Sequence, residues 1–337
     1  MTRIERLQQI GIRRLGSPKS GFRYRHADGS AVSRADLDRI HWLKLPPAWT
    51  DVAIDPNPGA SLQAAGKDVA GRWQYRYHEA RVRKRERQKL QRIIAFAGAL
   101  PKLRAAVARD LNLPGLPREK VFAAIVRVMA TRYLRPGSLQ YAEENDSYGL
   151  VTLLKKHATI GGGAVRLRFR GKSGKEHEVE LRDPAVVRVV RACMDLPLRQ
   201  LFQYRTAEGE AVRASRRALN AYIKEVMGEK FSAKDFRTWA GTLICANLLA
   251  KDADEIPETR RGKKRFITAA VKETARRLGN TPAVCRASYI APVVLADFEK
   301  GRTLPATVPN VDRLVERRSL HRAERALVAR LKKEAAG

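Results

Sequence analysis

Apolar residues in most of the chain follow the spacing of α-helices. Beyond about residue 90 they recur at steps of three and four, which places them on one helical face. In KVFAAIVRVMATRYL, one such face carries Val121, Ile125, Val128 and Met129. The same spacing predicts buried helices over 232–250 and 266–280, and a long charged helix over 311–336.

The first 90 residues follow a different pattern. Short apolar runs such as FRYRHADGSAV and DVAIDPNPG have the length of β-strands, and Asp-Gly and Asn-Pro turn signals punctuate them. We therefore predict an α+β protein. It has a small β-sheet-rich domain over residues 1–90 and a larger, mainly α-helical domain over residues 91–337.

One β element interrupts the helical domain. In AVRLRFRGKSGKEHEVELRD (164–183), three apolar residues alternate with three arginines, and after a turn two apolar residues alternate with glutamates. This period of two on both sides of GKSGK predicts a β-hairpin. Its first strand carries basic side chains on one face, and Lys172 lies at its tip.

The segment GNTPAVCRASYIAP predicts a break between two helices. Gly279 and Asn280 are typical of a helix end, whereas Thr281 and Pro282 are typical of an N-cap and a first helical position. We therefore expect Tyr289 about two turns into a short helix.

The composition points to a polyanionic partner. The 337 residues include 67 Lys+Arg against 35 Asp+Glu, a formal net charge of +32, while 44% hydrophobic residues still allow a folded core. A charge this large opposes compaction unless an anion lies against it, and nucleic acid is the best candidate. An anionic membrane is the rival, but no apolar run approaches the roughly 18–20 residues of a spanning helix.

Neither the N-terminal segment nor the cysteines indicate export. MTRIERLQQIGIRRLG contains acidic residues and no apolar run, so we expect no signal peptide. Cys193, Cys245 and Cys285 are odd in number and form no CxxC pair, which argues against a zinc site and a disulfide framework. We expect a reduced, cytoplasmic protein.

The sequence contains no common cofactor or metal motif. It has no Walker A loop, no GxGxxG after a strand and no zinc-ligand spacing. The acidic run from Asp252 to Glu255 could hold Mg²⁺, but its loop-like surroundings favour a solvated acidic loop. We therefore expect neither a metal nor a cofactor. The six histidines are scattered, and none falls near Tyr289 in the sequence.

An enzyme that cleaves nucleic acid without a metal must neutralise a phosphate with its own cations. Arginine suits this role because its planar fork matches two phosphate oxygens and stays charged. Tyrosine can attack phosphorus and depart again as an oxyanion. Five candidates for such a site are Arg135, where Pro136 and Gly137 are expected to stop a helix, Lys172, Arg237 in KDFRTWAG, Asn280 and Tyr289.

These segments together resemble a known family. LRPGSLQYAEENDSYGLVTLLKKH, FRGKSGKEHEVEL, KDFRTWAG and GNTPAVCRASYI look like the catalytic domain of type IB DNA topoisomerases, especially the compact poxvirus and bacterial branch. GKDVAGRWQYRYHEARV is similar to the DNA-clamping sheet of that branch. The likeness runs in order over roughly residues 40 to 300. It implies an enzyme that clamps duplex DNA and relaxes supercoils without ATP or metal.

The resemblance also implies a role for each candidate. Tyr289 is expected to form a 3′-phosphotyrosyl bond, with Arg135 and Arg237 on the non-bridging oxygens and Lys172 protonating the departing 5′-oxygen. Asn280 stands where the family usually has histidine. An amide can donate a hydrogen bond but does not titrate in this range, so this position is expected to need only a donor.

Further residues are candidates for DNA contact. Cations, amides and aromatic groups together suit backbone contacts with limited groove contact. The candidates are Lys67, Arg72, Gln74, Tyr75 and Tyr77 in the first domain, and Tyr141 and Lys234 in the second. The alternative for the first group is a structural strand with Trp73 and the tyrosines in a core, and Lys234 could belong to a solvated face.

Two other classes of protein remain open. A tyrosine recombinase uses a similar set of residues, but it typically has histidine where this chain has Lys234, and its N-terminal domain is usually helical. A non-catalytic DNA-coating protein would need the charge but not Tyr289. For the favoured topoisomerase we expect a monomer that binds double-stranded DNA, avoids membranes and is associated with the nucleoid.

Overall fold

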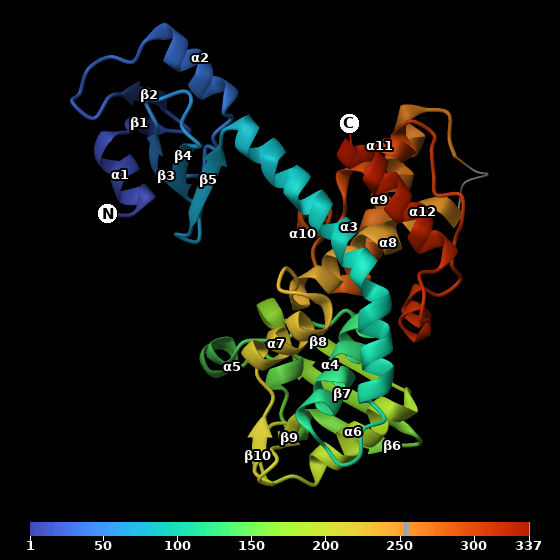
Figure 1. Cartoon of the computed structure of the whole chain (residues 1–337). Helices are drawn as coiled ribbons and strands as arrows, with labels where there is room; N and C mark the ends of the chain where they lie inside the picture. Colours follow the sequence, from blue (N-terminus) through green and yellow to red (C-terminus); the bar gives the residue numbers. More distant parts are fainter. Residues whose placement is uncertain (252–255, 337) are drawn as a thin grey trace. The chain divides into compact units, whose positions relative to one another are not determined.

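The computed structural model describes residues 1–251 and 256–336 (Figure 1). The fold is mixed, with 53% helix and 16% strand, so the predicted α+β class is confirmed. The chain divides into two compact units, Met1–Lys89 and Leu90–Gly337. We describe each unit by itself.

The first unit is built on an antiparallel sheet with the strand order β2-β1-β3-β4-β5. Its strands and helices are α1 (Arg3–Ile10), β1 (Ile12–Ser17), β2 (Gly21–Arg25), α2 (Arg34–Trp42), β3 (Thr50–Ile54), β4 (Leu62–Lys67) and β5 (Trp73–Tyr77). The two runs read as strands in the sequence form β2 and β3. The two helices were not predicted, although Thr2 and Ser33 cap them with side-chain hydrogen bonds.

Each face of this sheet is covered by one helix. Ile40 of α2 and Leu43, the residue after the helix, pack on the face that presents Val52 and Ile54, while Leu7 of α1 packs on the opposite face. Alternate residues of β3 therefore enter different cores, as the pleat requires. Trp73 and Tyr77 of β5 pack against the core under α1, so the structural role considered for this strand is confirmed for these two side chains.

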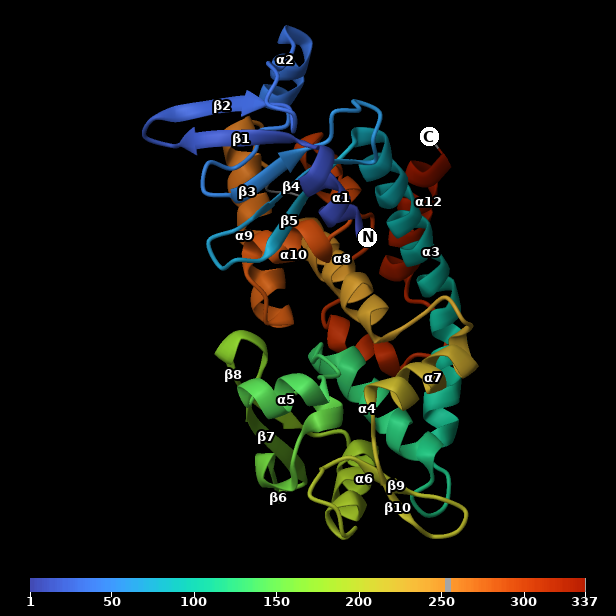
Figure 2. The same ribbon diagram turned by 90° about the vertical axis from the view of Figure 1, so that its left-hand side faces the viewer.

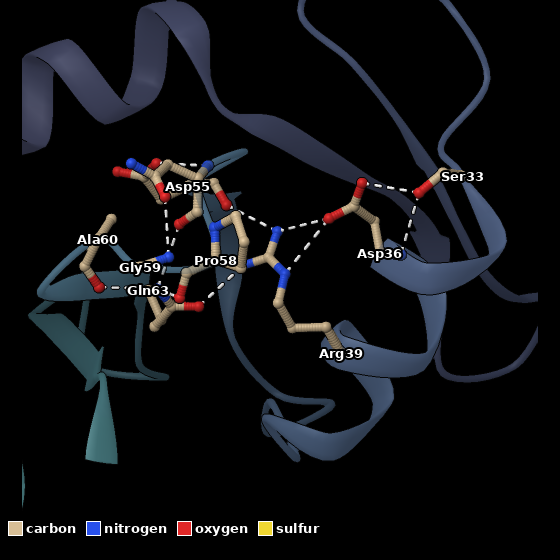
Figure 3. A network of polar contacts seen from close by, with 9 residues as sticks. Ser33, Asp36, Arg39, Asp55, Pro58, Gly59, Ala60 and Gln63 are labelled. Carbon is tan, nitrogen blue, oxygen red and sulfur yellow. Dashed lines mark hydrogen bonds and ion pairs between the residues drawn. The ribbon is translucent and has the colours of Figure 1, made fainter. Parts of the chain in front are cut away.

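A polar network fixes the loop between β3 and β4 (Figure 3). The side chain of Gln63, only 3% exposed, donates to the carbonyl oxygens of Pro58 at 2.9 Å and Ala60 at 2.7 Å. Its oxygen accepts a 2.8 Å hydrogen bond from Arg39, which also binds Asp36. One buried amide thus anchors the loop to α2.

The second unit is mainly helical. Helix α3 (Glu79–Asp110) begins in the first unit and continues into the second. The elements that follow are α4 (Arg118–Arg132), α5 (Leu139–Asn145), η1 (Leu150–Thr152), η2 (Lys155–His157), β6 (Ala158–Gly161), β7 (Ala164–Arg170), η3 (Lys172–Gly174), β8 (Glu176–Leu181), α6 (Pro184–Met194), β9 (Gln203–Arg205), β10 (Ala211–Arg213), α7 (Arg216–Met227), α8 (Ala233–Lys251), α9 (Arg260–Leu278), α10 (Pro282–Ser288), α11 (Pro292–Glu299), η5 (Val311–Glu316) and α12 (Arg322–Ala336).

Helices α4 and α8 lie in the centre of this unit. Helix α4 contacts α6, α7, α8 and η5, and α8 also contacts α9, α11 and α12 (Figure 1). Both are apolar on nearly every side, which is typical of helices surrounded by neighbours. The predicted helices over 232–250 and 266–280 correspond to α8 and α9. Helix α8 carries Arg237 into this apolar interior.

The predicted hairpin is present as β7 and β8. Val165 and Leu167 are buried, while Arg166 and Arg168 point outward and pair with Glu180 and Glu178 across the hairpin. A third strand, β6, pairs with β7, and β9 pairs with β10; neither was predicted.

Two predicted helix ends are wrong. Helix α4 ends at Arg132, before Pro136, because Tyr133 takes a left-handed conformation with φ 55°. The single helix expected over 311–336 is instead η5 followed by α12. Glu324 accepts hydrogen bonds from buried Arg104 and from the backbone of His321, which fixes a new helix start at this point.

The cysteines and the lengths of the helices bear on the predictions about disulfides and membranes. Cys193, Cys245 and Cys285 are free thiols and are buried. Among the helices of residues 1–251 and 256–336, none is long and apolar enough to span a membrane.

Removing the buried amide of the first unit is expected to destabilise it. Gln63→Ala leaves the carbonyl oxygens of the loop without their donor, and we expect a loss of about 1–3 kcal/mol in the free energy of unfolding. Urea titration monitored by tryptophan fluorescence measures it. Val69→Ala truncates a side chain that is 89% exposed and serves as the control, with a change within about 0.5 kcal/mol. Equal stability of the two variants would contradict the role of the network.

Candidate active site

Six of the predicted residues line one cavity of the second unit. The cavity has a volume of about 430 Å³. Its walls include Arg135, Tyr141, Lys172, Lys234, Arg237 and Tyr289. Figure 2 shows how this happens, since the β7–β8 hairpin lies close to the C-terminal end of α9. Residues separated by more than 150 positions in the sequence thus meet around one space.

Arg135 is held by a close crossing of two backbone segments. The amides of Leu150 and Val151 donate to the carbonyl oxygens of Arg135 and Pro136 at 3.0 and 2.8 Å. A Cβ atom on Gly149 would lie only 2.5 Å from the backbone nitrogen of Gly137, so the crossing requires glycine. This crossing fixes the loop from which the Arg135 side chain enters the cavity.

Arg237 is almost completely buried, with 3% of its surface exposed. Its Nη1 donates to the carbonyl oxygen of Tyr133, and its Nη2 donates to that of Leu278 at 2.7 Å. Burial, followed by the positive charge of Arg135, lowers the pKa of Arg237 to about 10. Within the described residues its Nε has no hydrogen-bond partner. A buried cation with a free N–H is a strong site for an anion.

Asn280 follows a left-handed glycine at the end of α9. The amides of Gly279 and Asn280 donate to the carbonyl oxygens of Arg276 and Ala275, a Schellman motif, so the helix end predicted here is confirmed. The side-chain oxygen of Asn280 accepts a hydrogen bond from Arg135. Its Nδ2 is buried and has no partner in the part of the chain that the structure describes. The amide therefore presents a second free donor.

Tyr289 ends α10, the short helix that Thr281 caps and Pro282 begins, as predicted. Its ring lies 5.0 Å from the guanidinium carbon of Arg237. Its side chain also interacts with the side chains of both Arg135 and Arg237. The Thr242 hydroxyl lies 3.2 Å from both the Tyr289 carbonyl oxygen and the Ala291 amide. The tyrosine is thus fastened to α8 at its backbone.

Lys172 lies at the exposed tip of the β7–β8 hairpin. Ser173, with φ 62°, and Gly174, with φ 72°, make the tight turn, and the Gly171 amide donates to the Lys175 carbonyl oxygen at 2.7 Å. Lys172 lines the same cavity as Arg135 and Arg237. The hairpin tip predicted for Lys172 is confirmed.

The sequence analysis missed His177. Its ring stacks on Phe169 with the centroids 5.0 Å apart, and a Cβ atom on Gly279 would lie 3.3 Å from its Cε1. Burial, and then the positive charges of Lys175 and the two arginines, lower the pKa of His177. Its place on the apolar face of β8, with Val179 and Leu181, was the signal that could have indicated it.

Two of the residues predicted to contact DNA line this cavity. Tyr141 is on α5 and is 58% exposed, which leaves its ring accessible. Lys234 is in the first turn of α8, one turn before Arg237. The next residue, Asp235, binds Arg92 and caps the helix through Ser232, so Lys234 is exposed at a fixed helix start.

The other five predicted DNA contacts belong to the first unit. Lys67 forms an ion pair with Asp51 at 2.8 Å, and Asp68 binds Arg72 at 3.2 Å and Gln74 at 2.9 Å. Tyr75 and Tyr77 stack with their ring centroids 6.0 Å apart, and Tyr75 is the more exposed. These residues form one polar and aromatic edge along β4 and β5.

The cavity is strongly electropositive. Among the described residues, its walls contain no aspartate or glutamate, but they contain nine cations: Arg132, Arg135, Lys172, Lys175, Arg216, Lys234, Arg237, Arg276 and Arg277. Like charges this close repel one another and hold local anions strongly. Together with the unpartnered Nε of Arg237, they make the cavity suited to an anion close to the side chain of Tyr289.

A metal site is not evident in the described residues. No group of three or more His, Cys, Asp or Glu side chains there could hold a metal ion. The acidic run considered for Mg²⁺, Asp252 to Glu255, lies outside the described residues.

The fold and the site are those of a protein suited to bind a polyanion at a basic cavity lined by a tyrosine. Comparison with known proteins gives the family. The profile "Eukaryotic DNA topoisomerase I, catalytic core" matches residues 78–300, and "Bacterial DNA topoisomerase IB, N-terminal domain" matches residues 21–68. This chain belongs to the type IB DNA topoisomerase family, a family of isomerases.

Individual relatives agree with this assignment. DNA topoisomerase 1B of Acanthamoeba polyphaga mimivirus is 35% identical over 83% of this chain and 85% of its own length. DNA topoisomerase I of Monkeypox virus is 22% identical over 76% of this chain and 80% of its own length. The resemblance seen in the sequence is therefore confirmed.

A solved structure shows a weaker likeness. The XerH site-specific recombinase in a post-cleavage complex has a TM-score of 0.34 and 16% identity, covering 57% of this chain and 47% of that chain. A likeness at this level does not distinguish a recombinase from a topoisomerase.

Two glycines in helices are expected to respond oppositely to alanine. A Cβ atom on Gly241 would lie 2.7 Å from the Tyr289 carbonyl oxygen, so we expect Gly241→Ala to lower the free energy of unfolding by about 1–3 kcal/mol. Gly98 of α3 has nothing within 4 Å, so Gly98→Ala is expected to raise it by about 0.5–1 kcal/mol. Chemical denaturation of both variants measures the difference, and stabilisation by both would show that Tyr289 is not held by this contact.

Proposed function

We propose that this chain relaxes supercoiled double-stranded DNA by the type IB reaction, with Tyr289 as the nucleophile. The observation that supports this most strongly is the unpartnered donor Arg237 Nε, on a guanidinium whose carbon lies 5.0 Å from the Tyr289 ring. A second unpartnered donor, Asn280 Nδ2, belongs to the amide that accepts a hydrogen bond from Arg135. A buried donor without a partner costs free energy, and a phosphate oxygen would satisfy it. The chain belongs to the type IB topoisomerase family, and such a site is suited to the type IB reaction.

The first step transfers a phosphodiester from the DNA to the enzyme. The Tyr289 oxygen attacks phosphorus, the bond from phosphorus to the 5′-oxygen breaks, and a 3′-phosphotyrosyl bond forms. The phenol loses its proton to the surroundings, and Lys172 gives a proton to the departing 5′-oxygen. The new ester keeps the energy of the broken bond, so the reverse step reseals the strand without ATP.

Arg135, Arg237 and Asn280 stabilise the charge that develops on the phosphorus. Arg237 keeps two of its N–H groups on backbone carbonyl oxygens, which leaves the others for the phosphate. Donors that are already fixed in place need no reorganisation during the reaction, which is the main source of their catalytic effect. His177, whose pKa is lowered, remains neutral in the same cavity at neutral pH.

We propose that both units bind DNA. In the first unit, Lys67 and Arg72 would exchange their carboxylate partners for backbone phosphates, with Gln74, Tyr75 and Tyr77 beside them. Tyr141 and Lys234 would contact the duplex near the cleavage site. The enzyme would close around DNA as a monomeric clamp, in the cytoplasm at the nucleoid.

Two alternatives were kept open by the sequence. Family membership favours the topoisomerase over the tyrosine recombinase. A DNA-coating protein has no use for a tyrosine that interacts with buried Arg237 and half-buried Arg135. Site-specific strand exchange between two duplexes would instead support a recombinase.

Tyr289→Phe removes one oxygen atom and tests the nucleophile directly. We expect this variant to bind duplex DNA as the unchanged enzyme does, but to form no covalent adduct and to relax no plasmid in EDTA without ATP. Denaturing gels with either strand end labelled will show whether the enzyme is attached through a 3′-phosphate. Attachment to a 5′-end, or adducts formed by Tyr289→Phe, would contradict the proposal.

Substitutions at Asn280 separate its donor from its acceptor. Asn280→Ala is expected to slow single-turnover cleavage on the order of 10²-fold, as for one lost transition-state donor. Asn280→Asp keeps the oxygen that accepts from Arg135 but loses the donor, so we expect at least the same loss. Asn280→His restores a donor and should cleave near the original rate. Fast cleavage by Asn280→Asp would show that only the acceptor matters.

A further inference from the structure

A carboxylate behind the cavity joins two segments of the catalytic unit. Asp312, on η5, accepts hydrogen bonds at its Oδ1 from the Tyr133 hydroxyl at 2.5 Å and from Arg277 Nη2 at 2.7 Å. Its Oδ2 lies 4.0 Å from Arg132. The side chain of Asn310 caps the Asp312 amide at 2.9 Å, which fixes the start of η5.

The two partners of Asp312 belong to the segments that hold Arg237. One carbonyl oxygen that accepts from the Arg237 guanidinium is that of Tyr133 itself. The other is that of Leu278, the residue after Arg277. One oxygen atom of Asp312 therefore joins the end of α4 to the end of α9. The backbones of these two helix ends orient the buried Arg237.

The end of α4 needs such support. Tyr133 has φ 55° and ψ 23°, a left-handed conformation that is unfavourable for a residue with a large side chain. A conformation of this kind persists where surrounding contacts impose it. Burial of the tyrosine and the hydrogen bond from its hydroxyl to Asp312 are such contacts, and Arg277 lies 5.8 Å above its ring.

We propose that Asp312 is a positioning residue of the active site, which sets the guanidinium of Arg237 through Tyr133 and Arg277. Asp312 lies beyond the region matched by the catalytic-core profile, residues 78–300. The proposal rests on the proposed role of Arg237 in cleavage. It makes the segment Val311–Glu316 part of the catalytic apparatus, although no residue of this segment lines the cavity among those described.

Asp312→Asn and Tyr133→Phe each break the connection with little change in shape. We expect each to slow single-turnover DNA cleavage by about 10-fold or more, because small displacements of a catalytic group reduce rates steeply. The dissociation constant for duplex DNA should change less than twofold. Tyr133→Phe removes only a hydroxyl group, so it decides the question if Asp312→Asn proves unstable at the assay temperature.

A matched control removes a similar cluster elsewhere in the same unit. Asp297 also accepts from two arginines, Arg302 at 2.6 Å and Arg330, but it does not line the cavity. Asp297→Asn should therefore lower the melting temperature without changing the cleavage rate measured well below it. Equal slowing of cleavage by Asp297→Asn would show a general loss of stability and would overturn the proposal.

A double-mutant cycle tests whether Asp312 acts through Arg237. In an Arg237→Lys background, the carbonyl oxygens of Tyr133 and Leu278 cannot orient the lysine amine as they orient the guanidinium. Adding Asp312→Asn to this variant should therefore slow cleavage by less than a further twofold. Independent, multiplicative effects would overturn the proposal. The proposal would also be overturned if Asp312→Asn and Tyr133→Phe cleaved DNA at the wild-type rate while Arg237→Lys cleaved it slowly. A fast Arg237→Lys would instead refute the catalytic role proposed for Arg237.

Discussion

The buried guanidinium of Arg237 is the constraint on which the catalytic unit depends. A cation that is 97% removed from solvent loses its hydration, and this burial is the main reason that its pKa falls to about 10. Two backbone carbonyl oxygens replace part of the lost water. Its Nε stays without a partner within the described chain, and that residual cost favours an anion in the cavity.

The backbone around this cation is correspondingly tight. Gly137 and Gly149 allow two segments to cross behind Arg135, and Gly241 allows α8 to approach the backbone of Tyr289. A side chain at any of these positions would push a catalytic candidate away from the arginine. Close backbone approach therefore fixes the positions of several polar side chains around one cavity. Among the described residues, the cavity wall contains no acidic group that would compete for the cations.

Local chemistry made much of the fold predictable. The alternation over 164–183 predicted the hairpin, and Gly279 with Thr281 and Pro282 predicted the helix break, because each signal acts within a few residues. The errors arose where distant groups intervened. The C-terminal helix breaks where Glu324 turns inward to Arg104, and α4 ends early at Tyr133, whose hydroxyl binds Asp312. No pattern within a short window contains those partners.

The sequence by itself determined the family, the chemical types at the site and the electropositive character of the chain, because motifs and net charge need no coordinates. Only the tertiary structure decided that Asn280 accepts from Arg135, that His177 enters the cavity and that Asp312 connects the two segments around Arg237. These relations join residues more than 100 positions apart in most cases. They depend on how α4, α8, α9 and η5 pack together, because the carbonyl oxygens that hold Arg237 lie at the ends of α4 and α9, and Asp312 of η5 binds both ends.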